Sequence, residues 1–221
     1  MAQCFNSVRE IKQISKNIFI VEKVISTEMK NFLLEGLSEV EKLSALLKEY
    51  DISFCILGGR ALPFYGYRRF TEDVDVLVAE EDQKKLAKIP SGVLSDHSKL
   101  KPFRVWIMSH FPDKKKIKVD MLFSKDAAGG NIKFDDPKKV SHEINGIPVI
   151  NLYDLIRYKI TSGIHGARSK DFGDVEELIK ANNLPASYMD KEKVSFMKKK
   201  YTELHKNAMI QKESFDRDYE L

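Results

Sequence analysis

The 221-residue sequence has few of the residues that characterise extracellular or fibrous proteins. It contains two cysteines, seven prolines and one tryptophan, which excludes a disulfide scaffold and a collagen-like chain. No stretch approaches the roughly 18 consecutive apolar residues of a membrane-spanning helix, and residues 1–20 lack the apolar core of a signal peptide. We therefore expect a soluble, cytoplasmic protein that does not contact membranes and whose cysteines are reduced.

Charge of one sign is not in large excess either. The 37 Lys and Arg residues are set against 33 Asp and Glu residues, giving a net charge of +4. Such a surplus does not by itself indicate nucleic-acid binding, which needs basic residues gathered on one face. At about 150 residues per domain, the length corresponds to one large domain or two small ones. The function must therefore be inferred from a site.

The hydrophobic pattern predicts helices and strands in the first part of the chain. Residues 28–50 carry the apolar stripe of an amphipathic helix, and the apolar run 52–57 predicts a strand. The alternation of acidic and apolar residues over 73–78 is typical of a second strand. Residues 104–111 and 116–124 have strand composition and a turn-forming sequence between them, so they predict a hairpin.

After residue 128 the pattern becomes mainly helical. The exception is a short hairpin predicted over 143–150, centred on Asn145-Gly146, a pair that favours tight turns. This order of elements indicates an α+β fold. We place a domain boundary near residue 128. Residues 1–128 form a core that includes an N-terminal helix, and residues 129–221 form a mainly helical C-terminal domain.

Three aspartates form the candidate chemical site. Asp73 and Asp75 are two residues apart on a predicted strand, so their side chains point to the same face. Asp120 interrupts the apolar pattern of 117–123 and joins the pair if its strand lies near the first. Two like charges 4 Å apart repel by about 4 kcal/mol at an effective dielectric constant near 20. Either one acid is protonated, or a divalent cation such as Mg²⁺ or Mn²⁺ lies among them.

A glycine turn upstream points to phosphate chemistry. Gly58-Gly59 ends a predicted strand and opens a short helix, where unpaired backbone N–H groups and the helix dipole favour anions. Arg60 adds a positive charge, and the chain returns through Arg69 and Thr71 to the acidic strand. Paired metal ions in such a site can stabilise both the attacking and the leaving oxygen of a phosphoryl displacement.

These residues resemble a known family. The first motif of the nucleotidyltransferase superfamily of the DNA polymerase beta type is similar to Gly58-Gly59-Arg60-Ala61, Tyr65-Gly66, Arg69, Thr71 and Asp73-Val74-Asp75. The third metal-binding acid of that family resembles Asp120. The helical motifs of bacterial abortive-infection and minimal nucleotidyltransferase toxins are similar to Asp154-Leu155-Ile156, Lys159, Arg168-Ser169-Lys170-Asp171-Phe172-Gly173-Asp174 and Leu178.

The resemblance implies a fold, a reaction and a set of site residues. The fold is a small mixed β-sheet with flanking helices, followed by a helical domain that closes over the nucleotide. The reaction is metal-dependent transfer of a nucleoside monophosphate from a nucleoside triphosphate such as ATP, with Mg²⁺ or Mn²⁺ as cofactor. Asp120 would also help to activate the attacking hydroxyl. The implied metal ligands are Asp73, Asp75 and Asp120, and the implied nucleotide-binding residues are Gly58, Gly59, Arg60, Arg69, Thr71 and Lys159.

The acceptor is not implied, because members of the family modify tRNA, proteins, small molecules and antibiotics. A toxin with an antitoxin partner is one such case. One departure concerns Arg60, which stands where the family usually has a serine that contacts a phosphate. An arginine can bind phosphate bidentately, or it can pair with a carboxylate instead.

Two other function classes stay open. One is a nucleotide-binding or regulatory module, catalytically weak or inactive, that acts through a protein partner. The other is a hydrolase or kinase that uses the same carboxylates, which is disfavoured because the sequence lacks G-x-x-x-x-G-K-[ST] and the kinase catalytic residues. For Lys159, exposure on an amphipathic helix is as reasonable as nucleotide binding. For Asp171 and Asp174, helix capping and ion pairing are at least as reasonable as chemistry.

Overall fold

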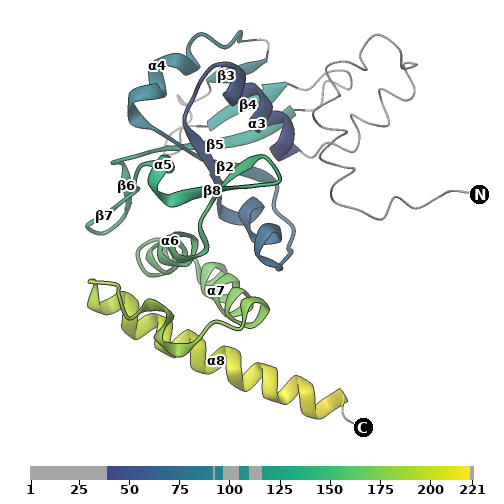
Figure 1. Ribbon diagram of the computed structural model, residues 1–221, viewed down its shortest axis with the longest axis vertical. Coiled ribbons are helices and arrows are strands. Elements are labelled where there is room, and N and C mark those ends of the chain that lie inside the picture. The colour runs from purple at the N-terminus through teal and green to yellow at the C-terminus, as the bar shows by residue number, and fades with distance from the viewer. Residues whose placement is uncertain (1–38, 92, 97–104, 110–115, 220–221) are drawn as a thin grey trace, which may run out of the picture.

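The computed structural model describes residues 39–91, 93–96, 105–109 and 116–219 of the chain. Its centre is a seven-stranded sheet with the strand order β3-β4-β5-β2-β1-β9-β8 (Figure 1). Strand β1 (Phe54–Leu57) pairs antiparallel with the central strand β2 (Asp73–Val78) and parallel with β9 (Ile147–Ile150). On its other side β2 pairs parallel with β5 (Lys116–Phe123). The sheet is therefore mixed, as predicted.

Antiparallel strands complete both edges of the sheet. β4 (Val105–Ser109) pairs with β5 and confirms the predicted hairpin, whose turn at 110–115 lies outside the described residues. β3 (Leu94–Asp96) lies beyond β4, and β8 (Ser141–Ile144) pairs with β9 at the opposite edge. A second sheet has only two strands, β6 (Ala127–Gly129) and β7 (Ile132–Lys133).

Residues 141–150 differ from the expected organisation. The predicted hairpin is present, with positive φ values of +52° at Asn145 and +79° at Gly146. It belongs to the main sheet, however, because β9 pairs with β1 and both Val149 and Ile150 are buried. The sheet thus continues past residue 128, and the change to helices comes only after β9. The division of the chain into two domains stays a prediction.

Helices flank the sheet and fill the C-terminal region. In Figure 1, α6, α7 and α8 lie together below the sheet, with α8 outermost. The structure confirms the predicted α+β fold, although the first predicted helix is described only from its residue 39 onward. No helix among the described residues is both long and apolar enough to cross a membrane. The helices are α3 (Glu39–Glu49), η1 (Gly58–Tyr65), η2 (Glu80–Asp82), α4 (Gln83–Leu86), α5 (Pro137–Val140), α6 (Leu152–His165), α7 (Ser169–Asn182), η3 (Ala186–Met189) and α8 (Ser195–Tyr219).

Local sequence explains where the helices begin and end. The side chain of Asn151 accepts a hydrogen bond from the backbone N–H of Asp154, so Asn151 caps α6 as its residue type favours. Gly66 ends η1 in the left-handed region with a φ of +82°. β5 alternates along its length, with Ile117, Val119 and other apolar residues buried on one face and Lys118, Asp120 and Leu122 half-buried on the other.

A buried charge network joins α6 and α7 to the segment after η1. The Asp174 carboxylate accepts hydrogen bonds from Arg69 Nε at 2.6 Å and from Arg69 Nη2 at 2.8 Å. Lys159 Nζ donates to Asp174 Oδ2 at 2.5 Å and to Asp171 Oδ1 at 3.1 Å. Burial raises the pKa of Asp174, but the hydrogen bonds of Arg69 and the charge of Lys159 outweigh it and hold that pKa below its usual value. The helices are thereby fixed to the segment that leads into β2.

We expect Asp174→Asn to destabilise the fold by about 3 kcal/mol at pH 7, because removing one member of a buried ion pair leaves its partners without a counter-charge. Since the folded-state pKa of Asp174 is lowered, its stabilising effect is complete above the ordinary carboxyl pKa and is lost as the pH falls through the folded-state value. Urea denaturation at decreasing pH measures both effects. Glu177→Gln removes a more exposed ion pair with Lys180, and a loss as large as that of Asp174→Asn would contradict the prediction.

Candidate functional site

Three aspartates lie on one face of the sheet where β2 and β5 pair directly. The parallel register places Asp75 opposite Asp120 and Asp73 opposite Lys118. Paired residues on neighbouring strands share a face, and so do residues two apart on one strand. The structure therefore brings Asp120 to the pair formed by Asp73 and Asp75, which the sequence predicted on the condition that the two strands were neighbours.

Lys118 is a fourth member of this cluster, and the sequence analysis missed it. Its Nζ donates to Asp120 Oδ2 at 2.9 Å and lies 3.4 Å from Asp73 Oδ2. A signal was available, because Lys118 is two residues before Asp120 on the same predicted strand and must share its face. A lysine ammonium is thus one counter-charge of the acidic cluster.

The two acids of β2 have opposite pKa shifts. Burial, followed by the charges of Asp73 and Asp120, raises the pKa of Asp75 to about 6, while the charges of Lys159 and Arg168 act in the other direction. Burial also raises the pKa of Asp73, but a 2.9 Å hydrogen bond from Thr71 Oγ1 and the charge of Lys118 outweigh it, so this pKa is lowered. Most of the electrostatic cost of the cluster therefore falls on Asp75.

The glycine turn packs directly against these carboxylates. Gly58 follows β1 with a φ of +65°, and Leu57 pairs with Asp75. A Cβ atom on Gly58 would lie 1.9 Å from Asp75 Oδ2, and a Cβ atom on Gly59 would lie 3.0 Å from the Thr71 side chain. No side chain fits at Gly58, so the main chain itself borders the acidic face.

The other predicted nucleotide-binding residues have protein partners. The Arg60 guanidinium forms an ion pair with Glu39 of α3, and Arg60 Nε donates to the Asp73 carbonyl oxygen at 3.3 Å. Thr71 holds Asp73 as described above. Arg69 and Lys159 belong to the Asp174 network and not to the acidic cluster. Their contact with a nucleotide stays a prediction.

Arg168 was part of the sequence motif but had no assigned role. It precedes α7, and its side chain is 52% exposed, with Nε 3.5 Å from Asp171 Oδ2. Its charge lowers the pKa of Asp75, so it acts on the acidic cluster from the helical region. The charge of Lys159 also lowers this pKa, but the Lys159 side chain is only 5% exposed.

The cluster fits a divalent cation by the chemistry of its donors. Carboxylate oxygens are preferred ligands of Mg²⁺ and Mn²⁺. Asp120 Oδ1 is buried and lacks a hydrogen-bond partner in the described part of the chain, so it is available as a ligand. In their present arrangement, the described residues include no group of three or more His, Cys, Asp or Glu side chains that could hold a metal ion. Lys118 lies against two of the three carboxylates instead.

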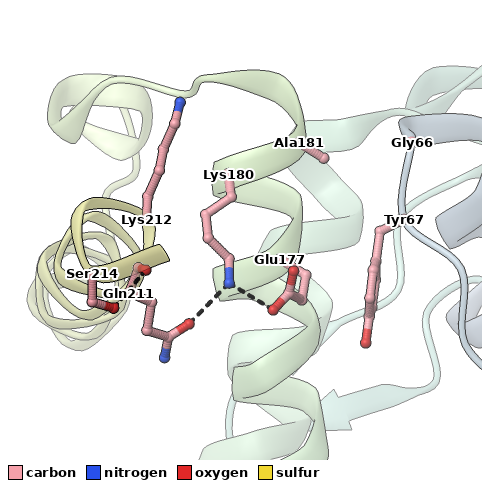
Figure 2. A pocket seen from close by; sticks show the side chains of 8 residues that line it. All are labelled: Gly66, Tyr67, Glu177, Lys180, Ala181, Gln211, Lys212 and Ser214. Carbon is pink, nitrogen blue, oxygen red and sulfur yellow. Dashed lines mark hydrogen bonds and ion pairs between the residues drawn. The ribbon is translucent and has the colours of Figure 1, made fainter. Parts of the chain in front are cut away.

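A separate pocket of about 560 Å³ lies among α7, α8 and the segment after η1 (Figure 2). Within it Lys180 Nζ lies 2.7 Å from Glu177 Oε1 and 2.9 Å from Gln211 Oε1. None of the three aspartates contributes to its lining, so it is distinct from the acidic cluster. The lining residues are Gly66, Tyr67, Glu177, Lys180, Ala181, Gln211, Lys212 and Ser214.

No protein-family model and no curated protein matches the chain. Among solved structures, an antigenic nucleotidyltransferase-like protein from Paracoccidioides brasiliensis is 19% identical, with a TM-score of 0.44, over 63% of this chain and 73% of its own. A candidate nucleotidyltransferase from Thermotoga maritima is 18% identical, with a TM-score of 0.42, over 61% and 91%. ANT(2″)-Ia, in complex with adenylyl-2″-tobramycin, is 16% identical, with a TM-score of 0.41, over 71% and 91%. The first of these is described as nucleotidyltransferase-like and the second as a candidate nucleotidyltransferase.

We expect Gly58→Ala to destabilise the protein by roughly 2–4 kcal/mol, since the left-handed backbone costs about 1–2 kcal/mol and overpacking against Asp75 adds a similar amount. Gly146→Ala is the matched control, because Gly146 has a φ of +79° but nothing within 4 Å of an added Cβ atom. Its expected cost is the backbone strain alone. Equal losses in urea denaturation of the two variants would show that the packing against Asp75 is unimportant.

We expect Asp75→Asn to stabilise the metal-free protein by up to about 3 kcal/mol at neutral pH, because it removes a carboxylate whose pKa is raised to about 6. For this raised pKa the folded state is penalised above pH 6, and the penalty fades as the pH falls towards 4. Thermal melts with a chelator at several pH values measure this change.

Asp82→Asn is the opposite control. Burial raises the pKa of Asp82, but hydrogen bonds from Lys85 and Ser53 outweigh it and lower that pKa. Asp82→Asn should therefore destabilise the protein at neutral pH. A destabilised Asp75→Asn protein at neutral pH would contradict the electrostatic description of the cluster.

Proposed function

We propose that the chain is a metal-dependent nucleotidyltransferase, which transfers a nucleoside monophosphate from a nucleoside triphosphate to a hydroxyl group of an acceptor. One observation carries the proposal: a positive-φ glycine turn borders Asp75 so closely that no side chain fits, at the register where Asp75 pairs with Asp120 and shares a face with Asp73. Main-chain groups at such a turn suit phosphate, and the carboxylates suit the cations that accompany it.

The reaction requires an in-line displacement at the α-phosphorus. The acceptor oxygen forms a bond to this phosphorus, and the bond to the pyrophosphate oxygen breaks. Asp73, Asp75 and Asp120 would hold Mg²⁺ or Mn²⁺, which would offset phosphate charge and lower the pKa of the acceptor hydroxyl. Asp120 would also help to activate this hydroxyl by accepting its proton. Thr71 keeps Asp73 ionised and in place.

The cations of the site have different tasks in this proposal. Arg168 is exposed and acts on Asp75, so it is placed to contact the triphosphate. Arg69 and Lys159 hold Asp174 of α7 and would support nucleotide binding by fixing that helix. Arg60 holds α3 through Glu39 and would take no direct part unless this pair opens.

The acceptor is proposed only as a hydroxyl compound: tRNA, a protein or a small molecule. A toxin with an antitoxin is one form that this activity could take. A second candidate is the weakly active nucleotide-binding module with a protein partner. Two observations favour it, namely the engagement of two carboxylates by Lys118 and the ion pair that occupies Arg60.

Thermal melts test the proposal directly. We expect the wild type to be stabilised by a nucleoside triphosphate only when Mg²⁺ or Mn²⁺ is also present. At a hundred times the dissociation constant, the gain should be about 2.7 kcal/mol, or roughly 5–10 °C for a domain of this size. Asp73→Asn/Asp75→Asn should show no such shift, and the exposed Asp190→Asn should behave as the wild type.

Transfer itself is measured with α-labelled triphosphates and pools of tRNA, protein and aminoglycoside acceptors. Labelled acceptor and released pyrophosphate would establish the reaction class. A metal-dependent shift without transfer to any acceptor would favour the binding module. Equal shifts in the wild type and in Asp73→Asn/Asp75→Asn would refute the assignment of the site.

A further inference from the structure

Lys159 and Lys118 each bridge two carboxylates, as Lys85 does between Asp51 and Asp82, but they do so in different settings. Lys159 lies between Asp171 and Asp174 with 5% of its side chain exposed. Lys118 lies between Asp73 and Asp120, and 43% of its side chain is exposed. A lysine head on a flexible four-carbon stem can leave an exposed pair without crossing the protein interior. Lys159 is therefore held in place, whereas Lys118 can exchange its partners.

The carboxylates that bind Lys118 are the ones proposed to bind metal. Asp120 Oδ2 and Asp73 Oδ2 lie 2.9 and 3.4 Å from its Nζ. A divalent cation that used both of these oxygens would lie within a few ångströms of the ammonium group, and the two positive charges would repel each other. The lysine and the metal ion thus cannot both engage the same oxygens at full strength.

We infer that Lys118 is a built-in competitor of the metal ion: its ammonium holds the acidic cluster together in the metal-free protein and must withdraw before Asp73 and Asp120 can bind a divalent cation. This inference rests on the proposed function, because it takes the three aspartates as metal ligands. It gives Lys118 a regulatory task, which is to set the metal concentration at which the site becomes competent.

The first test is the binding of Mn²⁺ alone, measured by electron paramagnetic resonance of the free ion. Lys118→Met removes the competing charge, and because a half-exposed pair is a weak competitor we expect binding to tighten by roughly three- to tenfold. Lys118→Arg keeps the charge and should bind as the wild type does. Lys116→Met removes a charge two residues earlier on the same face and should also leave the affinity unchanged.

The outcomes separate this inference from the proposed function. If Asp73→Asn/Asp75→Asn abolishes Mn²⁺ binding but Lys118→Met binds no more tightly than the wild type, the competition is refuted and the metal site stands. Weaker binding by Lys118→Met likewise refutes competition. If the wild type binds no Mn²⁺, or if the double variant binds it as well as the wild type, the proposed metal site fails and the inference fails with it.

A second measurement uses the wild type and does not depend on how the variants fold. An amine-reactive reagent is applied with and without Mn²⁺, and the modified lysines are identified by mass spectrometry. We expect Mn²⁺ to increase the labelling of Lys118 severalfold, because the ammonium is released from its two carboxylates. Labelling of Lys116 should not change. Unchanged or reduced labelling of Lys118 in the presence of bound Mn²⁺ would overturn the inference.

Discussion

The parallel register of β2 and β5 is the constraint on which the site depends. It sets Asp75 opposite Asp120 and Asp73 opposite Lys118, on the same face of a single sheet. Like charges on such neighbouring side chains repel one another, and at a separation of 4 Å the repulsion of about 4 kcal/mol would equal a large part of a domain's stability. The contacts of Lys118 and Thr71 reduce this repulsion for Asp73, whereas Asp75 retains it as a raised pKa. The same strand register thus pairs β2 with β5 and leaves Asp75 as a buried acid with a raised pKa.

The Asp174 network also buries carboxylates, but there the pKa of Asp174 is lowered, whereas the pKa of Asp75 is raised. Asp171 and Asp174 are buried, yet Arg69 and Lys159 supply them with fixed cations. All of these groups are held by secondary structure that packs around them. Both places leave one buried carboxylate oxygen, Asp171 Oδ2 or Asp120 Oδ1, without a hydrogen-bond partner among the described residues. They differ in the counter-charge, which is buried at Lys159 and partly exposed at Lys118. Removing one member of the buried network would leave an uncompensated charge, whereas the partly exposed lysine of the β2–β5 cluster can leave its carboxylates.

Local patterns predicted the parts of this site that depend on neighbours in sequence. Strand alternation placed Asp73 and Asp75 on one face, and residue type predicted the cap at Asn151 and the turn at Asn145-Gly146. The adjacency of Asp120 could only be conditional, because strand pairing is a long-range property. The burial of Lys159 was not predictable for the same reason, since its partners lie 12 and 15 residues away on another helix. The position of Lys118 was predictable from strand alternation, because it lies two residues before Asp120 on β5 and therefore shares its face.

Arg60 departs from the motif of the family that the sequence resembles, and its side chain contacts other parts of the protein. Its guanidinium is occupied by Glu39 of α3, and its Nε is occupied by the Asp73 carbonyl oxygen. The arginine therefore connects α3 to the first residue of β2. In the proposed function, with that side chain engaged, an anion at the turn would be bound by the main chain of Gly58 and Gly59. Binding by the main chain requires that the anion come close to the backbone, which a residue without a side chain permits. Gly58 is such a residue, and no other residue type fits there, because an added Cβ atom would collide with Asp75. Under that proposal, Gly58 would therefore carry a larger share of phosphate binding than it would beside a serine that shared the contact.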